Sequence, residues 1–326
     1  MKRIDSAAAL RWTLFALLAL VATAMLLPLI GSSSIDLRQA IKGISPDREI
    51  LFDVRVPRVL LAMMTGGALA ISGVLFQALL RDSLATPYTL GVSGGASLGA
   101  VVAIFFGLPY LWLFALIGSG LTLLIVLGIA AESRRVSAFT LLMAGVTLNS
   151  ISMAFILFLH SLASLGQSFA ITRWLMGGIE PVEPMTLIGI GVAVLACVLL
   201  SLSDARAWNL LSVGEDWAAS HGVAVTRMML RGYLIASILT GLVTSMTGPI
   251  GFVGLIVPHA LRMSTGADHR ILLPCSFLFG GIFLAVCDTA ARTVLAPTDI
   301  PVGVLTALIG GPFFIFLLRM RTRYHR

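Results

Sequence analysis

The positions of charged residues divide this chain into long apolar segments. Eight runs contain no Asp, Glu, Lys or Arg: 12–35, 59–80, 92–131, 136–172, 184–203, 232–261, 271–287 and 300–318. A helix that crosses a bilayer needs about 20 mainly apolar residues. The runs 92–131 and 232–261 exceed one crossing, and each contains a helix-breaking sequence, Gly107-Leu108-Pro109 in the first and a Gly/Pro segment in the second. The pattern therefore predicts an all-α polytopic membrane protein, one domain over residues 1–326, with about ten transmembrane helices.

The second break is the most informative stretch of the chain. It reads GPIGFVGLIVPHALR over residues 248–262 and is apolar enough for a bilayer, yet it is rich in helix breakers: Gly248, Pro249, Gly251, Gly254 and Pro258. Irregular backbone at membrane depth is tolerated only where protein or a water-filled cavity satisfies its polar groups. The segment predicts a short or broken helix inside a bundle, which is typical of transporters rather than of anchors.

Composition agrees with a membrane protein and narrows its class. The 326 residues are 58% hydrophobic and 11% charged, with a mean hydropathy of +1.00, which no soluble domain of this size requires. The first run could be a signal peptide, but it is long for one and no clear cleavage site precedes Ser32, so we interpret it as the first spanning helix. Cys197, Cys275 and Cys287 all lie in apolar helices and are expected to be packing thiols, neither disulfide-bonded nor metal ligands.

The distribution of Lys and Arg predicts the orientation in the membrane. With the N-terminus in the cytoplasm and ten crossings, 15 of the 22 basic residues fall inside and seven outside. The outside residues are Arg38, Lys42, Arg48, Arg55, Arg58, Arg173 and Arg292. The positive-inside rule then places both termini in the cytoplasm.

Two polar loops stand out between the predicted helices. The outer loop 31–57 contains a short amphipathic helix, for which Ser34 is the expected cap and Gly43 the expected stop. The loop 203–227 lies on the cytoplasmic side and is expected to form a short helix from Gly214 to His221, ended by Gly222. This loop is either a docking surface for another protein or an interfacial connector.

Small and polar residues in two helices leave two interpretations open. Gly91, Gly95 and Gly99 are four residues apart, a spacing that lets helix backbones approach closely and that could also line a pathway. The helix 138–160 contains Thr and Ser residues and Asn149, which can bond neighbouring helices or face a central passage.

Helices two to five and helices seven to ten each form a unit of four spans with a Gly-rich break near the second span, which suggests an inverted repeat.

The chain has no energy source of its own. Lys2 and Lys42 are its only lysines, and neither follows the glycine that a Walker A loop requires. The apolar runs contain no carboxylate that could couple transport to an ion; Asp288 lies in the outer half of helix nine, with Arg292 as the expected partner at i+4. His160 and His259 are expected to be hydrogen-bonded structural residues. Energy must come from another polypeptide, which the loop 203–227 could bind.

Six segments resemble the FecCD-type permeases, the membrane subunits of type II ATP-binding-cassette (ABC) importers for iron chelates, haem and vitamin B12. They are the stretch RVPRVLL…GGASLGA from residue 55, LLMAGV, GEDWAASHGV, GPIGFVGLIVPHALR, ADHRILLP and DIPVGVLTALIGGPFFIFLL, and the resemblance covers roughly residues 50–320. It implies a homodimer of ten-helix subunits with two ATPase subunits on the cytoplasmic face and a periplasmic binding protein outside.

The resemblance also implies roles for individual residues. The coupling helices that enter the ATPase groove would include Gly214, Glu215, Ala218, Ala219 and Gly222, with His221 where the family more often has Leu. The cytoplasmic gate would be Ser137, Ala138, Phe139 and Thr140. The substrate pathway would include Met143, Thr147, Asn149 and Ser150. Binding-protein docking would use Arg55, Arg58 and Arg292, since a guanidinium can hold a carboxylate through two parallel hydrogen bonds.

The prediction is a permease subunit in the bacterial inner membrane that imports a bulky metal chelate by alternating access. Iron–siderophore or haem is favoured over cobalamin as cargo. No cofactor is expected on this chain, because ATP and Mg²⁺ would bind the partner ATPase. An ion-coupled secondary carrier and a membrane-embedded enzyme are the alternatives; no coupling carboxylate supports the first and no nucleophile–base pair or metal cluster supports the second.

Overall fold

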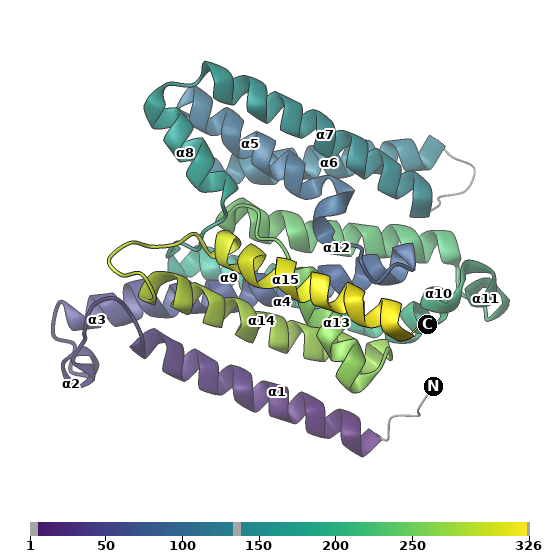
Figure 1. Cartoon of the computed structure of the whole chain (residues 1–326), viewed down its shortest axis with the longest axis horizontal. Helices are drawn as coiled ribbons and strands as arrows, with labels where there is room; N and C mark the ends of the chain where they lie inside the picture. The colour runs from purple at the N-terminus through teal and green to yellow at the C-terminus, as the bar shows by residue number, and fades with distance from the viewer. Residues whose placement is uncertain (1–5, 133–137, 325–326) are drawn as a thin grey trace.

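The computed structural model describes residues 6–132 and 138–324, and helices dominate the described chain (Figure 1). Its ten longest helices are α1 (Ser6–Leu26), α4 (Val56–Leu80), α5 (Val92–Phe106), α6 (Leu111–Glu132), α7 (Ala138–Leu162), α9 (Pro184–Ser203), α12 (Val225–Thr247), α13 (Val253–Thr265), α14 (His269–Thr293) and α15 (Val302–Tyr324). Seven helical segments are long and apolar enough to cross a membrane, and α5 and part of α15 are shorter apolar helices. The seven long segments, the two shorter apolar helices and the 13-residue helix α13 together make up the ten elements that the apolar runs predict.

Shorter elements join these helices. They are η1 (Leu27–Leu29), α2 (Leu37–Ile41), α3 (Asp47–Glu49), η2 (Ile50–Arg55), η3 (Pro87–Leu90), α8 (Leu165–Leu175), α10 (Ala205–Val213) and α11 (Glu215–Ser220). In Figure 1, α2 and α3 lie at one end of the molecule, and α10 and α11 lie at the other end. The start of α1 and the end of α15 lie at the same end as α10 and α11. Helix α1 therefore starts, and helix α15 ends, on the side of the predicted coupling loop.

Both predicted helix breaks are present. The first is made by Gly107, which ends α5 in a left-handed conformation (φ +64°) and donates its N–H to the carbonyls of Ala103 and Ile104. Helix α12 ends before Gly248 (φ +66°), and α13 begins after Phe252, whose φ of +69° is rare for a residue with a side chain. Phe252 packs against Gly310 of α15, since a Cβ on that glycine would lie 2.3 Å from the ring.

The packing of the helices supports the inverted repeat. Helix α4 packs on α14 and α13, and its counterpart α12 packs in the same way on α6 and α5. Each half contains a short helix entered through a left-handed residue, Gly91 (φ +80°) before α5 and Phe252 before α13. The Tyr88 hydroxyl joins the two entrances: it accepts a hydrogen bond from the Ile250 N–H at 2.7 Å and donates one to the Ile250 carbonyl.

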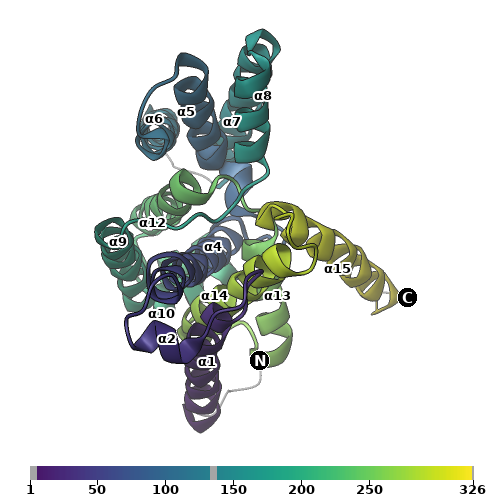
Figure 2. The ribbon, with the colours of Figure 1, turned by 90° about the vertical axis from the view of Figure 1, so that its left-hand side faces the viewer.

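Helix α4 packs backbone to backbone on α14 and α13 at glycine positions. A Cβ added to Gly66 would lie 2.1 Å from the Gly280 carbonyl oxygen, and one on Gly280 would lie 2.5 Å from that of Gly66. A Cβ added to Gly73 would likewise lie 1.9 Å from the Gly254 carbonyl oxygen of α13. These backbones touch because glycine leaves room for them, as the small-xxx-small pattern allows. Seen along the helices, α5 to α8 gather on one side of this core and α15 extends from another (Figure 2).

Several local predictions need correction or are confirmed. The short helix α2 is capped by Asp36, whose carboxylate accepts the Arg38 N–H at 2.8 Å, so the expectation that Ser34 is the cap was wrong. Gly43 follows α2 with φ +79°, as expected of a stop. All three cysteines are free and buried in the bundle: Cys197, Cys275 and Cys287. His160 contacts the Ser168 hydroxyl at 3.0 Å, which confirms a hydrogen-bonded structural role.

Candidate functional sites

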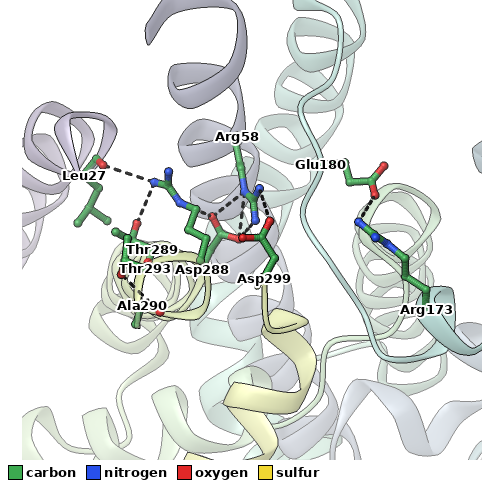
Figure 3. A network of polar contacts seen from close by, with 10 residues as sticks. Leu27, Arg58, Arg173, Glu180, Asp288, Thr289, Ala290, Thr293 and Asp299 are labelled. Atoms are coloured by element: carbon green, nitrogen blue, oxygen red, sulfur yellow. Dashed lines mark hydrogen bonds and ion pairs between the residues drawn. The ribbon is translucent and has the colours of Figure 1, made fainter. Parts of the chain in front are cut away.

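The buried carboxylate of Asp288 lies at the end of the molecule where α4 begins and is paired with two arginines. Asp288 is 1% exposed, and Arg58 holds it through two nitrogens, Nε at 3.1 Å and Nη2 at 3.0 Å (Figure 3). Arg292 Nε lies 3.6 Å from the same carboxylate, and Arg58 Nη1 lies 4.0 Å from Asp299. We call these four residues, Arg58, Asp288, Arg292 and Asp299, the Asp288 cluster. The buried Asp288 is paired with both arginines, as a buried charge requires, and the exposed Asp299 brings the cluster to two positive and two negative charges.

The helices fix the geometry of this cluster. Asp288 and Arg292 are one turn apart on α14, which brings their side chains to the same face. Arg58 lies in the first turn of α4, after Pro57, and reaches Asp288 because α4 and α14 pack closely. The sequence correctly predicted the contact between Asp288 and Arg292. It gave no sign of the closer contact with Arg58, which is 230 positions away in the chain.

Two of the three predicted docking arginines are buried in this structure. Arg55 is 4% exposed, and its guanidinium donates to the carbonyls of Pro28, Leu29 and Ser33. It therefore fixes the turn that follows α1 rather than facing outward. Arg292 is 6% exposed and is held by Asp288. Only Arg58, with 18% of its side chain exposed, keeps a surface that a partner could reach.

The predicted coupling residues lie together at the opposite end. Gly214 separates α10 from α11, Glu215 is the first residue of α11, and Gly222 turns the chain with φ +82°. Ala218 is buried and Ala219 exposed. The sequence did not predict α10 as a separate helix, although its buried residues Ala205, Trp208 and Leu211 follow a helical spacing.

Polar contacts fasten this loop to the bundle. Glu215 accepts from Arg81 at 3.2 Å, so α11 touches the end of α4, and Asp204 pairs with Arg231 of α12 at 3.0 Å. Trp208 is fully buried and donates its indole N–H to the Ser201 carbonyl at 3.1 Å. These contacts fix the loop against the bundle. Helix α11 still presents an exposed surface that includes Trp217, which is 52% exposed and contacts the ring of His221.

One carboxylate beside this loop has a strongly shifted acidity. Asp268 precedes α14, and its carboxylate accepts hydrogen bonds from the Arg270 side chain and from the Asn209 amide. These bonds favour the charged form and hold the pKa of Asp268 far below its usual value, although burial opposes them. Asp268 is therefore a permanently charged cap on the first turn of α14.

The predicted gate and pathway residues lie on α7. Ser137 lies outside the described residues; α7 begins at Ala138, and Phe139 in its first turn is exposed. Met143, Thr147 and Ser150 share one exposed face of α7, since they are four and three residues apart. Asn149 does not belong to this face. It is half-buried against Gly94 of α5, where a Cβ would lie 2.3 Å from the amide oxygen, so it packs two helices together.

Taken together, these features define a class of protein. Two discontinuous helices enter a bundle of long apolar helices, the charged cluster at one end is neutralised, and a structured polar loop protrudes at the other. Discontinuous helices inside a bundle of long apolar helices are typical of a polytopic membrane transport protein.

Comparison with known proteins gives the family. The sequence model of the FecCD transport family matches residues 16–320, and the chain belongs to that family. It is 39% identical over 285 residues to the hemin transport system permease protein HmuU of Yersinia pestis, covering 85% of each chain. It is also 39% identical to the cobalamin import system permease protein BtuC of Halobacterium salinarum, over 83% of this chain and 74% of the relative.

A solved structure agrees with the sequence relatives. It is described as an inward-facing conformation of a putative metal-chelate type ABC transporter, and it superimposes with a TM-score of 0.85 at 32% sequence identity. The match covers 95% of this chain and 99% of the solved chain. The predicted fold class and the predicted FecCD resemblance are both confirmed.

Proposed function

We propose that this chain is the membrane-spanning permease of an ATP-driven importer that carries a bulky metal chelate, an iron–siderophore or haem. The observation that supports this most strongly is the superposition with a metal-chelate type ABC transporter over nearly the whole chain. The hemin permease of Yersinia pestis is among its relatives at 39% identity. Cobalamin is the alternative cargo, because a cobalamin permease matches at the same identity.

The partners follow from the two ends of the molecule. Two ATPase subunits would bind the α11 side, where Gly214, Glu215, Ala218, Ala219 and Gly222 form the coupling surface. That side would be cytoplasmic, as would both termini, in agreement with the excess of Lys and Arg there. A binding protein would dock at the opposite end, near Arg58. The chain itself would hydrolyse nothing, because ATP and Mg²⁺ belong to the partner.

A homodimer would place the pathway between two copies of α7. The face with Met143, Thr147 and Ser150 is exposed in the single chain, so it is free to meet a second copy or a substrate. The start of α7, Ala138 to Thr140, would form the cytoplasmic gate. Alternating access would then rock the two copies about this seam.

Reconstitution tests this function directly. The chain is purified with its ATPase and binding-protein partners, and uptake into liposomes is measured with ATP or with an imposed proton or sodium gradient. Uptake that requires ATP and the binding protein supports the proposal. Uptake driven by a gradient alone would establish the secondary carrier instead. The absorbance and mass of the ligand bound to the purified binding protein decide among haem, siderophore and cobalamin.

A further inference from the structure

Helix α14 connects the two functional ends of the molecule. It has 25 residues, which at 1.5 Å per residue gives a length of about 37 Å, enough to span the hydrocarbon core of a bilayer. Asp288 near its last turns belongs to the Asp288 cluster. Its first residue, His269, and the capping Asp268 lie beside α10. If α14 moves as one body, a shift of its Asp288 end also shifts its Asp268 end.

Close packing, rather than the helix alone, would keep α14 together as it moves, because Pro274 in its second turn removes one backbone hydrogen bond. Its middle is pressed against α4 at Gly66 and Gly280, where backbone atoms touch. Arg58 fastens the same two helices again near Asp288. Closely packed interfaces of this kind shift as bodies rather than deform continuously.

A single carboxamide attaches α10 to the start of α14 through three contacts. Asn209 donates from Nδ2 to Asp268 Oδ1 at 2.8 Å, and its Oδ1 accepts from the His269 backbone N–H at 2.8 Å. The same Oδ1 lies 2.7 Å from His269 Nδ1; since the amide oxygen can only accept, the imidazole carries its proton on Nδ1. We call Asn209, Asp268, His269 and Arg270 the Asn209 cluster.

The other attachments of the loop lead elsewhere in the bundle. Trp208 packs on Gly232 of α12 and bonds Ser201 of α9, and Asp204 pairs with Arg231 of α12. Glu215 pairs with Arg81 at the end of α4. Asn209 is thus the hydrogen-bonding residue of α10 that holds the capped first turn of α14, and it does so with both of its functional atoms.

We infer that Asn209 is a positioning residue that makes α10 and α14 move as one body, so that docking near Asp288 is transmitted along α14 to the ATPase subunits. The inference rests on the proposed function, since it assigns a path for the signal within that importer. Asn209 needs no contact with ATP, substrate or either partner to act in this way. Its role is to keep the coupling loop in register with the helix that carries the docking end.

A pair of substitutions isolates this contact. Asn209→Asp places a carboxylate oxygen where the amide N–H donated, about 2.8 Å from the Asp268 carboxylate, and like charges at that distance repel. Adding Asp268→Asn restores a donor opposite an acceptor, because the amide introduced at position 268 can donate to the carboxylate introduced at position 209. The amide nitrogen then takes the place of Asp268 Oδ1, which also accepts the Arg270 backbone N–H at 3.0 Å, so the double variant restores the contact with α10 while weakening the cap on the first turn of α14. Arg231→Gln is the matched control, since it loosens the loop from α12 but not from α14.

The measurement is ATP hydrolysis by the assembled importer in lipid nanodiscs, with and without loaded binding protein. For Asn209→Asp we expect basal hydrolysis within about twofold of the parent and stimulation reduced about tenfold, which corresponds to about 1.4 kcal/mol of lost coupling. The double variant should recover most of the stimulation, and Arg231→Gln should keep it. If Asn209→Asp fails to assemble, the double variant decides: an assembled, stimulated double variant supports the inference and an assembled, unstimulated one overturns it.

Other outcomes are equally decisive. Normal stimulation in Asn209→Asp, or equal loss of stimulation in Arg231→Gln, would overturn the role of Asn209. A parent complex that neither hydrolyses ATP nor responds to the binding protein would instead refute the proposed importer, independently of Asn209.

Discussion

The two ends of α14 use similar residues in different surroundings. In the Asp288 cluster the carboxylate is 1% exposed, and the partner Arg292 side chain is 8% exposed. In the Asn209 cluster, Asp268 is 21% exposed and its partner Arg270 is 60% exposed. Water screens the second pair and is excluded from the first, so removing one partner has very different consequences at the two ends. Burial, rather than the number of contacts, decides how much each cluster contributes to stability.

The largest expected effect follows from neutralising the buried carboxylate. Asp288→Asn leaves Arg292 and part of Arg58 without a counter-charge in the bundle, and breaking a buried pair in this way typically costs about 3–5 kcal/mol. We expect a large drop in the thermal unfolding temperature of the purified protein in detergent. Asp299→Asn is the control, because Asp299 is 55% exposed and lies 4.0 Å from Arg58. Equal unfolding temperatures for the two variants would show that the Asp288 cluster is not stabilised by its buried charge balance.

A smaller effect is expected where the Asp288 cluster reaches the surface. Arg58→Gln removes the one partly exposed cation of the three predicted docking residues, while Gln can still donate to Asp288 and Arg292 remains as its counter-charge. We expect affinity for the binding protein to fall about tenfold at low salt, with a flatter salt dependence, because peripheral charges act mainly on association. Binding is measured by surface plasmon resonance at several ionic strengths.

Arg173→Gln is the control for that measurement, since Arg173 is exposed and already paired with Glu180 at 3.3 Å. Unchanged affinity in Arg58→Gln at every salt concentration would remove Arg58 from the docking surface. The expectation that Arg55 also docks is better tested structurally: its guanidinium holds the turn after α1, so Arg55→Glu should reduce folding yield rather than change docking alone.

The same burial argument explains what the sequence could and could not predict. Charge-free runs and Gly/Pro breaks predicted the ten helices because hydropathy and helix breaking act locally. The contact between Asp288 and Arg292 was predictable because i+4 spacing on a helix fixes it. The contacts of Arg58 with Asp288 and of Asn209 with Asp268 join distant parts of the chain, and only the packing of α4, α10 and α14 determines them. The burial of Arg55 was missed for the same reason, because its position in an outer loop gave no sign that carbonyls surround it.

A pH experiment tests how much the charge of Asp268, at the start of α14, contributes to stability. The pKa of Asp268 is lower in the folded protein than in the unfolded chain, so its contribution to stability is full above about pH 5, starts to be lost as the pH falls past the unfolded value near 4, and is fully lost only below the folded pKa, which is lower still. Asp268→Asn keeps the cap but cannot titrate, and we expect it to cost about 0.5–2 kcal/mol at neutral pH, the usual range for a perturbed helix cap. Unfolding of the parent and the variant is followed between pH 7 and 3. The two curves should approach each other as the pH falls from 5 to 3, and a constant separation would contradict a charged Asp268.

The smallest effect on stability and the clearest separation of stability from function come from two exposed ion pairs. Two exposed ion pairs have similar lengths: Arg81 with Glu215 in the coupling loop at 3.2 Å, and Arg173 of α8 with Glu180 at 3.3 Å (Figure 3 shows the second). Exposed pairs contribute about 0–1 kcal/mol, so Glu215→Arg and Glu180→Arg should both unfold close to the parent temperature.

The two variants should differ in coupling. Glu215 begins α11, where a negative charge suits the helix N-terminus, and reversing that charge also repels Arg81 at the surface proposed to meet the ATPase. We therefore expect Glu215→Arg to weaken ATPase assembly or to raise the ATP hydrolysed per substrate imported, and Glu180→Arg to leave both unchanged. Because the two variants carry the same charge reversal in exposed pairs of similar length, a loss of coupling confined to Glu215→Arg can be ascribed to its position on α11, whereas intact coupling there would exclude Glu215 from the coupling surface.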